Sequence, residues 1–176
     1  MTNRGISTFA LGALGLILFV RGVSAQTAAV PAATGAAHQV VLSHVPSDRK
    51  WKLGFNSRTY DKASTELEEL IAKKLTDKDM AKADAMSGTC CKLVIEVVEI
   101  SQHTAAFGKS GIDMVANFVV QDAAGKQLIS RIFRGESRTV GMHTWGGMID
   151  MAEKLLVDSA FEAEELTAAL KGSGSR

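Results

Sequence analysis

The chain has 176 residues, with 20 Lys and Arg against 19 Asp and Glu, so its formal net charge is +1. Nucleic-acid-binding proteins carry a strong basic excess, and the absence of one here argues against that class. The length suits a single domain with one core, which needs neither several disulfides nor a structural metal to fold.

Residues 1–25 have the pattern of a secretory signal peptide. Arg4 precedes an apolar run over 9–20, and small residues at 23–25 come before Gln26. The apolar run is shorter than the roughly 20 residues that cross a bilayer. We therefore expect cleavage before Gln26 and a periplasmic or secreted protein, with an uncleaved N-terminal anchor as the alternative.

The rest of the chain predicts one domain between two flexible ends. No second apolar run reaches bilayer length, so we expect no transmembrane segment in the mature chain. A bacterial lipoprotein signal places Cys directly after the cleavage point, where this chain has Gln26. The small, uncharged segment 26–37 predicts a flexible lead, followed by a domain over 38–171 and a disordered tail over 172–176.

The first part of the domain predicts two short strands and a helix. Apolar runs favour strands at 39–42 and 51–55. A helix is expected to begin at Asp61 or Thr65, since Thr65 and Glu68 have the spacing of a capping box. Its apolar face comprises Ala63, Leu67, Leu70, Ile71 and Leu75.

A solvated face, a loop and a strand are expected next. The helical spacing places Glu66, Glu69 and Lys73 on the wet side of the helix. The polar stretch 77–89 predicts a helix end and a loop. The strand over 91–102 changes its apolar phase after Val97, which indicates a bulge there or burial on both faces.

A hairpin and a long helix complete the domain. Strands over 112–120 and 127–134 flank a turn in which Gly125 takes a positive φ, and Arg131 and Arg134 would protect an edge strand. The helix is expected from Trp145 or Gly147 to Leu170. Its apolar or small stripe comprises Met148, Met151, Leu155, Ser159, Ala163, Leu166 and Leu170.

This order of elements predicts an α+β fold: a two-layer sandwich of a mainly antiparallel sheet with two helices packed on one face. The segments LVIEVVEI (93–100), MVANFVVQDAAGKQLISRIFRGES (114–137) and WGGM (145–148) resemble the YajG-like and related uncharacterised bacterial envelope lipoprotein families. The resemblance covers 51–170. It implies a role as an envelope or transport-accessory component and brings no catalytic residues, and the chain departs from these families in lacking the acylated cysteine.

Two glycine-containing loops supply the candidate contact residues. Before the last helix, His143, Trp145, Gly146 and Gly147 could present backbone N–H groups to an anion, or form a tight turn that brings the helix close to the sheet. Trp145 is a candidate for ligand or partner contact, with core packing as the alternative.

The other loop joins the strands over 91–102 and 112–120. It contains Phe107 and Lys109 among small residues. A tip-exposed Phe107 would dock on a partner or a membrane surface, whereas a Phe107 folded back on the loop would have no such role.

The two cysteines, Cys90 and Cys91, are neighbours. On a strand they point to opposite faces, so burial of one face would place only one of them in the core. They are inert thiols or partners in a vicinal or intermolecular disulfide, with redox or metal chemistry as the third alternative.

The histidines match no catalytic or metal motif. Two loop histidines and a distant carboxylate could meet as at a zinc site, but their spacing does not require it. We therefore expect no catalytic residue, no metal and no cofactor. The four histidines are His38, His44, His103 and His143.

These features together predict an exported, non-enzymatic cell-envelope protein that acts as a protein-interaction or transport and assembly accessory module. Its expected partner is another envelope protein. The alternative is a small-molecule-binding protein for an apolar or anionic ligand, with a pocket between the sheet and the C-terminal helix in which Met114, Met148 and Met151 take part.

Overall fold

The computed structural model describes residues 38–53, 56–86, 91–105, 109–140 and 144–172. The chain divides into two units, Met1–Thr34 and Gly35–Arg176, and all the described residues belong to the second unit. The expected signal peptide, the flexible lead and residues 173–176 lie outside the described residues.

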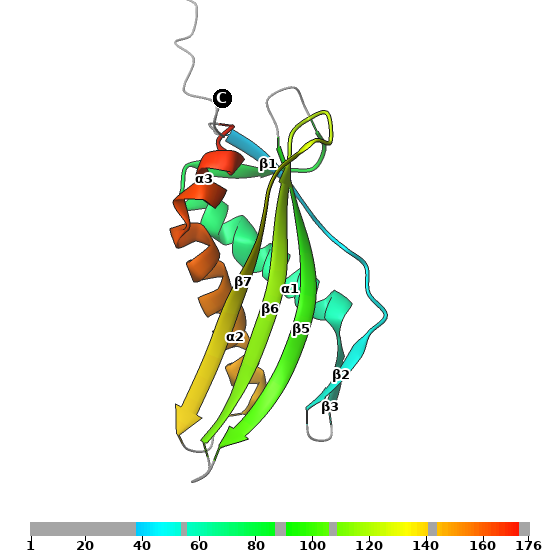
Figure 1. The fold of residues 1–176 in the computed structure, drawn as a ribbon, viewed down its shortest axis with the longest axis vertical. Helices are drawn as coiled ribbons and strands as arrows, with labels where there is room; N and C mark the ends of the chain where they lie inside the picture. Colours follow the sequence, from blue (N-terminus) through cyan, green and yellow to red (C-terminus); the bar gives the residue numbers. More distant parts are fainter. Residues whose placement is uncertain (1–37, 54–55, 87–90, 106–108, 141–143, 173–176) are drawn as a thin grey trace, which may run out of the picture. The chain divides into compact units, whose positions relative to one another are not determined.

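A five-stranded mixed sheet forms the frame of the domain (Figure 1). In spatial order its strands are β4 (Met80–Ala83), β1 (His38–His44), β5 (Cys91–Ala105), β6 (Lys109–Gln121) and β7 (Gln127–Val140). β1 runs parallel to β4 and β5, whereas β5, β6 and β7 form an antiparallel meander. A separate hairpin pairs β2 (Lys50–Leu53) with β3 (Asn56–Thr59).

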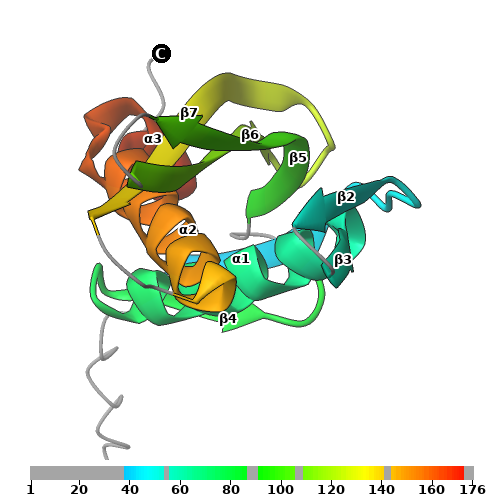
Figure 2. The same ribbon diagram turned by 90° about the horizontal axis from the view of Figure 1, so that it is seen from below.

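The helices cover one face of this sheet (Figures 1 and 2). They are α1 (Tyr60–Thr76), α2 (Trp145–Glu162) and α3 (Glu164–Leu170). α1 contacts β1, β4 and β5, while α2 contacts β6, β7 and α1. The opposite face of the meander carries none of the described helices. Within the described part of the chain, no helix is long and apolar enough to span a membrane.

The core lies between the helices and the sheet. Alternate side chains of β6 point toward the helices, and their burial follows from the two-residue period of a strand. These residues are fully buried: Ile112, Met114, Ala116, Phe118 and Val120. On α1, the predicted helical spacing holds for Ala63, Leu67, Ile71 and Leu75, which are also fully buried and belong to the same core.

The start of α1 differs from the predicted capping box. The helix begins at Tyr60, and the Thr59 hydroxyl caps it by accepting a hydrogen bond of 3.1 Å from the Lys62 amide. Thr65 lies inside the helix, where its hydroxyl donates to the Asp61 carbonyl at 3.1 Å. The prediction of a helix start at Asp61 is therefore close, whereas Thr65 as the cap is wrong.

Three features of the architecture correct the sequence prediction. The sheet is mixed, because β1 pairs in parallel on both sides. The stretch expected as a loop contains β4, whose sequence MAKA carries little strand signal. The expected C-terminal helix is two helices, because Ala163 adopts an extended conformation between α2 and α3. The prediction of an α+β fold with helices on one face of the sheet is confirmed.

The buried face of α2 is rotated from the predicted one. Met151, Leu155 and Ser159 are predicted inside but lie exposed, with Met151 and Leu155 at 42% and 44%. The ends of the predicted stripe, Met148 and Leu170, are buried as expected. Both phases have helical spacing, so periodicity alone does not choose between them. The buried residues of α2 are Met148, Ile149, Ala152, Glu153, Leu156, Val157, Ala160 and Phe161.

Gly135 on β7 allows α2 to approach the sheet closely. A Cβ atom at this position would lie 1.9 Å from the Ala152 carbonyl oxygen and 2.7 Å from the Leu156 amide nitrogen. Because both atoms belong to the helix backbone, they cannot move aside without displacing α2. The close packing of α2 on β7 therefore requires glycine at position 135.

The meander contains the predicted bulge and turn. The register between β5 and β6 shifts between Val97 and Glu99, which confirms the bulge. Gly125 has a φ of 79° in the turn between β6 and β7, also as predicted. β7 is an edge strand, and it continues to Val140 beyond the predicted end at Arg134.

Side chains protect the part of β5 that extends past β1. The phenol oxygen of Tyr60 accepts a hydrogen bond of 3.2 Å from the Ile100 amide, and Arg49 donates to the Val98 carbonyl at 3.0 Å. Arg49 also lies over the Tyr60 ring, 4.2 Å from its centroid. These contacts occupy backbone groups that would otherwise be open to another strand.

Candidate functional site

A pocket of about 310 Å³ lies between α1 and α2. Helical spacing brings one row of residues from each helix to its walls. Four of the lining residues carry carboxyl groups and one carries an amine. The lining residues are Glu66, Glu69, Leu70 and Lys73 from α1, and Asp150 and Glu153 from α2.

Glu153 is the buried acid of this α1–α2 pocket. It is only 2% exposed, and its Oε1 has no hydrogen-bond partner among the described residues. The pKa of Glu153 is raised to about 7, and burial is the largest cause. The charge of Arg58 lowers this pKa, whereas the charge of Asp150 raises it. A carboxyl group without a partner, at the wall of a pocket, is available to a ligand.

The neighbouring Glu66 is already paired. It forms an ion pair with Arg58 of β3, and both side chains are largely buried. Glu69 and Lys73 are exposed, as predicted for the wet side of α1. Glu66 departs from the predicted solvated face in one respect, since its side chain is 28% exposed and pairs with Arg58 of β3.

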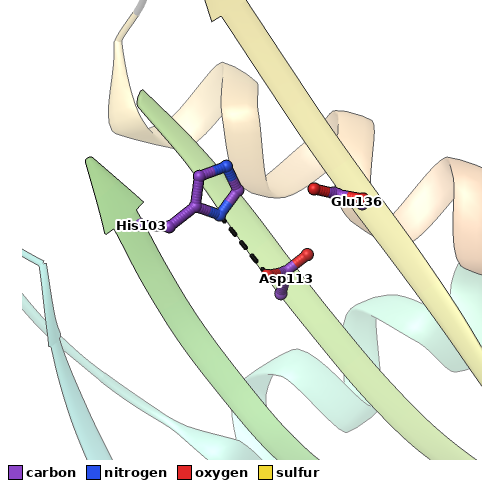
Figure 3. A group of neighbouring side chains, drawn as sticks. All are labelled: His103, Asp113 and Glu136. Atoms are coloured by element: carbon purple, nitrogen blue, oxygen red, sulfur yellow. Dashed lines mark ion pairs between the residues drawn. The ribbon is translucent and has the colours of Figure 1, made fainter. Parts of the chain in front are cut away.

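A second group of titratable residues lies on the sheet face without helices. Figure 3 shows His103 on β5, Asp113 on β6 and Glu136 on β7. One ligand atom from each of the three lies within 4.8 Å of the others. His103 Nδ1 is 3.4 Å from Asp113 Oδ2, the contact drawn dashed in Figure 3.

Two arginines neutralise the carboxylates of this outer-face cluster of His103, Asp113 and Glu136. Arg134 lies 3.0 Å from Asp113 Oδ2, and Arg138 reaches Glu136 at 2.5 Å. Both arginine side chains are exposed, at 60% and 76%. The second Asp113 oxygen, Oδ1, is buried and has no hydrogen-bond partner in the described part of the chain.

The predicted residues of the glycine-containing loop are only partly described. His143 lies outside the described residues. Trp145 is the first residue of α2 and packs, partly buried, against the core. Gly146 and Gly147 are exposed, and a Cβ atom would meet nothing within 4 Å at Gly146 and only Thr144 Oγ1, at 3.5 Å, at Gly147. Close approach of the helix therefore depends on Gly135 and not on this pair.

The structure also describes only some of the other predicted contact residues and cysteines. Phe107 and Cys90 lie outside the described residues, and only the backbone of Lys109, at the start of β6, is described. Cys91 is buried, and its thiol donates to the Leu170 carbonyl at 3.2 Å. This places one member of the cysteine pair in the core, as the alternation of a strand predicts.

The α1–α2 pocket does not coincide with the expected one between the sheet and the C-terminal helix. Met114 and Met148 are buried within the core, and Met151 points outward from α2. Sequence reasoning missed the signal that was present for the observed pocket: Glu153 is an acidic residue between apolar neighbours on what proves to be the buried face of its helix.

No family model and no curated protein matches the chain. Among solved structures, it is similar to protein XCC0632 from Xanthomonas campestris, of family DUF330, at 17% identity and a TM-score of 0.53, covering 78% of this chain and 88% of that one. It is also similar to the hypothetical protein CT253 from Chlamydia trachomatis, at 14% identity and a TM-score of 0.51, covering 78% and 98%.

A minor lipoprotein from Acinetobacter baumannii matches at 12% identity and a TM-score of 0.46, over 77% of this chain and 94% of that one. At such identities the likeness to XCC0632 and CT253 concerns the fold: this α+β arrangement occurs in other bacterial proteins.

Proposed function

We propose that this chain is an exported cell-envelope protein that works by binding rather than catalysis, and that its α1–α2 pocket receives a cationic group from a protein partner. The observation that carries this proposal is the buried, unpartnered carboxyl group of Glu153 at the pocket wall. The envelope location is supported by the signal-peptide pattern of residues 1–25.

The charges of the pocket favour a cation. Glu69, Asp150 and Glu153 face a single lysine, Lys73, while Glu66 is occupied by Arg58. An ammonium or guanidinium group would donate to Glu153 Oε1 and favour its ionised form. The same charges disfavour the anionic ligand of the alternative prediction.

The size of the pocket favours a side chain over a large ligand. Its volume of about 310 Å³ lies at the lower end of ordinary ligand pockets, which hold drug-sized molecules at 300–1,000 Å³. Exposed Glu69 and Asp150 at the walls would meet a partner's surface around the inserted group. A lysine or arginine side chain of a protein fits both the volume and the charge.

The test is a titration of the chain in the form that its host exports, followed by amide NMR shifts. The probes are n-butylammonium, which mimics a lysine side chain, and an oligolysine peptide. Shifts are expected in α1 and α2, with the peptide binding more tightly because it also meets Glu69 and Asp150. Equal affinity for the two probes would instead identify a free amine as the ligand.

Glu153→Gln is expected to weaken peptide binding at pH 8 by at least about 10-fold, since a charge-assisted hydrogen bond is lost. The wild type should bind about 10-fold more tightly at pH 8 than at pH 6, because Glu153 ionises in this range. Glu162→Gln, at an exposed position of the same helix, is the matched control. Equal binding by wild type and Glu153→Gln would contradict the proposal.

A further inference from the structure

The register of the meander builds the outer-face cluster. Ser101 pairs with Asp113, and Asp113 pairs with Glu136, in one row across β5, β6 and β7. His103 lies two residues beyond Ser101, so its side chain shares that face and reaches Asp113 diagonally. Three adjacent, hydrogen-bonded strands therefore hold one imidazole and two carboxylates over a common point (Figure 3).

Gly111 provides the space in which the imidazole lies. A Cβ atom at this position would be 2.2 Å from His103 Nε2 and 2.3 Å from the Ser137 carbonyl oxygen. Any larger residue would push the ring away from β6. The glycine thus allows the His103 ring to lie across β6 with Nδ1 directed at Asp113.

The distances suit a small, tetrahedrally coordinated ion. Two ligand atoms bound to one tetrahedral zinc ion lie about 3.3 Å apart, given bonds of about 2.0–2.1 Å. His103 Nδ1 and Asp113 Oδ2 are already 3.4 Å apart. The ligand oxygen of Glu136 lies within 4.8 Å of the other two ligand atoms, and rotation of its side chain would bring it closer to the same ion.

The second Asp113 oxygen points independently to a missing partner. The Asp113 side chain is only 15% exposed, and its buried Oδ1 accepts no hydrogen bond from the described residues. A buried carboxylate oxygen without a donor is unfavourable unless something else neutralises it. A cation bound to Oδ1, or to both oxygens of the carboxylate, would supply the missing partner.

Arg134 and Arg138 do not prevent this binding. Both arginine side chains are long and mostly exposed. Ion pairs made by exposed arginine side chains contribute little in water, so a metal ion can displace the two guanidinium groups. A divalent ion would take the place of the two guanidinium charges, and all three residues of the cluster would bind it directly.

We propose that His103, Asp113 and Glu136 form a site for a divalent transition-metal ion, with Zn²⁺ as the first candidate. The imidazole nitrogen and the carboxylate oxygens are ordinary zinc ligands, and a water molecule would complete the tetrahedron. The site is separate from the α1–α2 pocket, because it lies on the opposite face of the sheet.

The experiment is a calorimetric titration of the exported chain with ZnCl₂. We expect one zinc ion per chain, with affinity reduced at least about 10-fold in both His103→Gln and Glu136→Gln, since each removes a direct ligand. His44→Gln is the matched control. Its imidazole also lies between two carboxylates, at 2.8 Å from Glu68 and 3.2 Å from Asp61, but outside the outer-face cluster.

Circular dichroism of each variant verifies folding before titration. If His103→Gln does not fold, Glu136→Gln provides the comparison, because Glu136 lies on the partly exposed edge strand. The proposal would be overturned if His103→Gln or Glu136→Gln bound zinc as tightly as the wild type, or if His44→Gln lost zinc binding. A wild-type protein that binds no zinc would overturn it as well.

Discussion

The carboxyl group of Glu153 titrates near neutral pH because α2 holds it in the layer between the helices. Its pKa lies at about 7 instead of 4.5, with burial as the largest cause. The unfolded chain, in which this group is hydrated, loses the proton at a lower pH. Between these two values the folded protein binds more protons than the unfolded one, so rising pH favours unfolding.

We therefore expect Glu153 to reduce the free energy of unfolding by about 3 kcal/mol as the pH rises from about 4.5 to 7, with no further loss above that range. Glu153→Gln should lack this decrease and be more stable than wild type at pH 8. Denaturant unfolding at pH 5 and pH 8 measures both quantities.

His44 makes the comparison with the variant necessary. Burial lowers the pKa of His44, but its contacts with Glu68 and Asp61 outweigh that effect and raise it above 6.5. Its stabilising contribution is also lost as the pH rises through the folded-state pKa, so both groups change stability in the same direction. The difference between wild type and Glu153→Gln isolates Glu153, and parallel pH curves for the two proteins would contradict the assigned pKa.

At the scale of elements, the contact between α2 and β7 depends on one residue. Gly135→Ala would place a methyl group 1.9 Å from the Ala152 carbonyl oxygen. We expect a loss of about 1–3 kcal/mol or more in the free energy of unfolding, because the helix must move away from the strand. Denaturant unfolding of the variant measures this loss.

The matched control for Gly135→Ala is Gly146→Ala, in the first turn of α2, where the added Cβ would meet nothing within 4 Å. Alanine has the higher helix propensity, so this change should be neutral or stabilise by up to about 1 kcal/mol. If Gly135→Ala is as stable as the control, the close packing described here is wrong.

The same contact explains why the face of α2 was not predicted correctly. Apolar residues at Ile149, Leu156 and Val157 compete with those at Met151 and Leu155 for the inner position. Periodicity cannot decide between the two sets, since the deciding factor is the space above Gly135 on another element. The pocket follows from that choice, because only the observed phase turns Glu153 inward.

The outer-face cluster was hidden for a different reason. Its residues come together only if the pairing of three strands is known. The bulge between Val97 and Glu99 shifts the register of β5 against β6, and a second irregularity after Val120 shifts β6 against β7. The sequence predicted the bulge and the turn at Gly125, but a one-residue error in either register would have placed different side chains side by side.

For the whole molecule, hydrophobic patterns in the sequence predicted the layer of helices on the sheet. They did not predict the parallel pairing of β1 with β4 and β5. Long strands and helices have strong periodicity, and the meander and α1 appeared close to where the sequence predicted them. β1 and β4 are short, and the choice of partner for a short strand depends on tertiary contacts. Their pairing therefore could not be derived from local sequence.

The export of the protein is the prediction that concerns the entire chain. Arg4, the apolar run over 9–20 and the small residues at 23–25 should direct secretion and cleavage. Expressed from Met1 in a bacterial host, the exported protein should have an intact mass beginning at Gln26. A mass that retains residues 1–25 would indicate the N-terminal anchor instead, and a Gln26→Pro variant, in which proline blocks processing, serves as the control for cleavage.

The position of β1 also has a mechanical consequence. His38 opens a strand that lies inside the sheet, between β4 and β5, and not at its rim. A pull along β1 from its N-terminal end would load both of its parallel ladders in shear, so that their hydrogen bonds resist together and are not unzipped one at a time. Any tether attached ahead of His38 would transmit tension directly into the interior of the sheet.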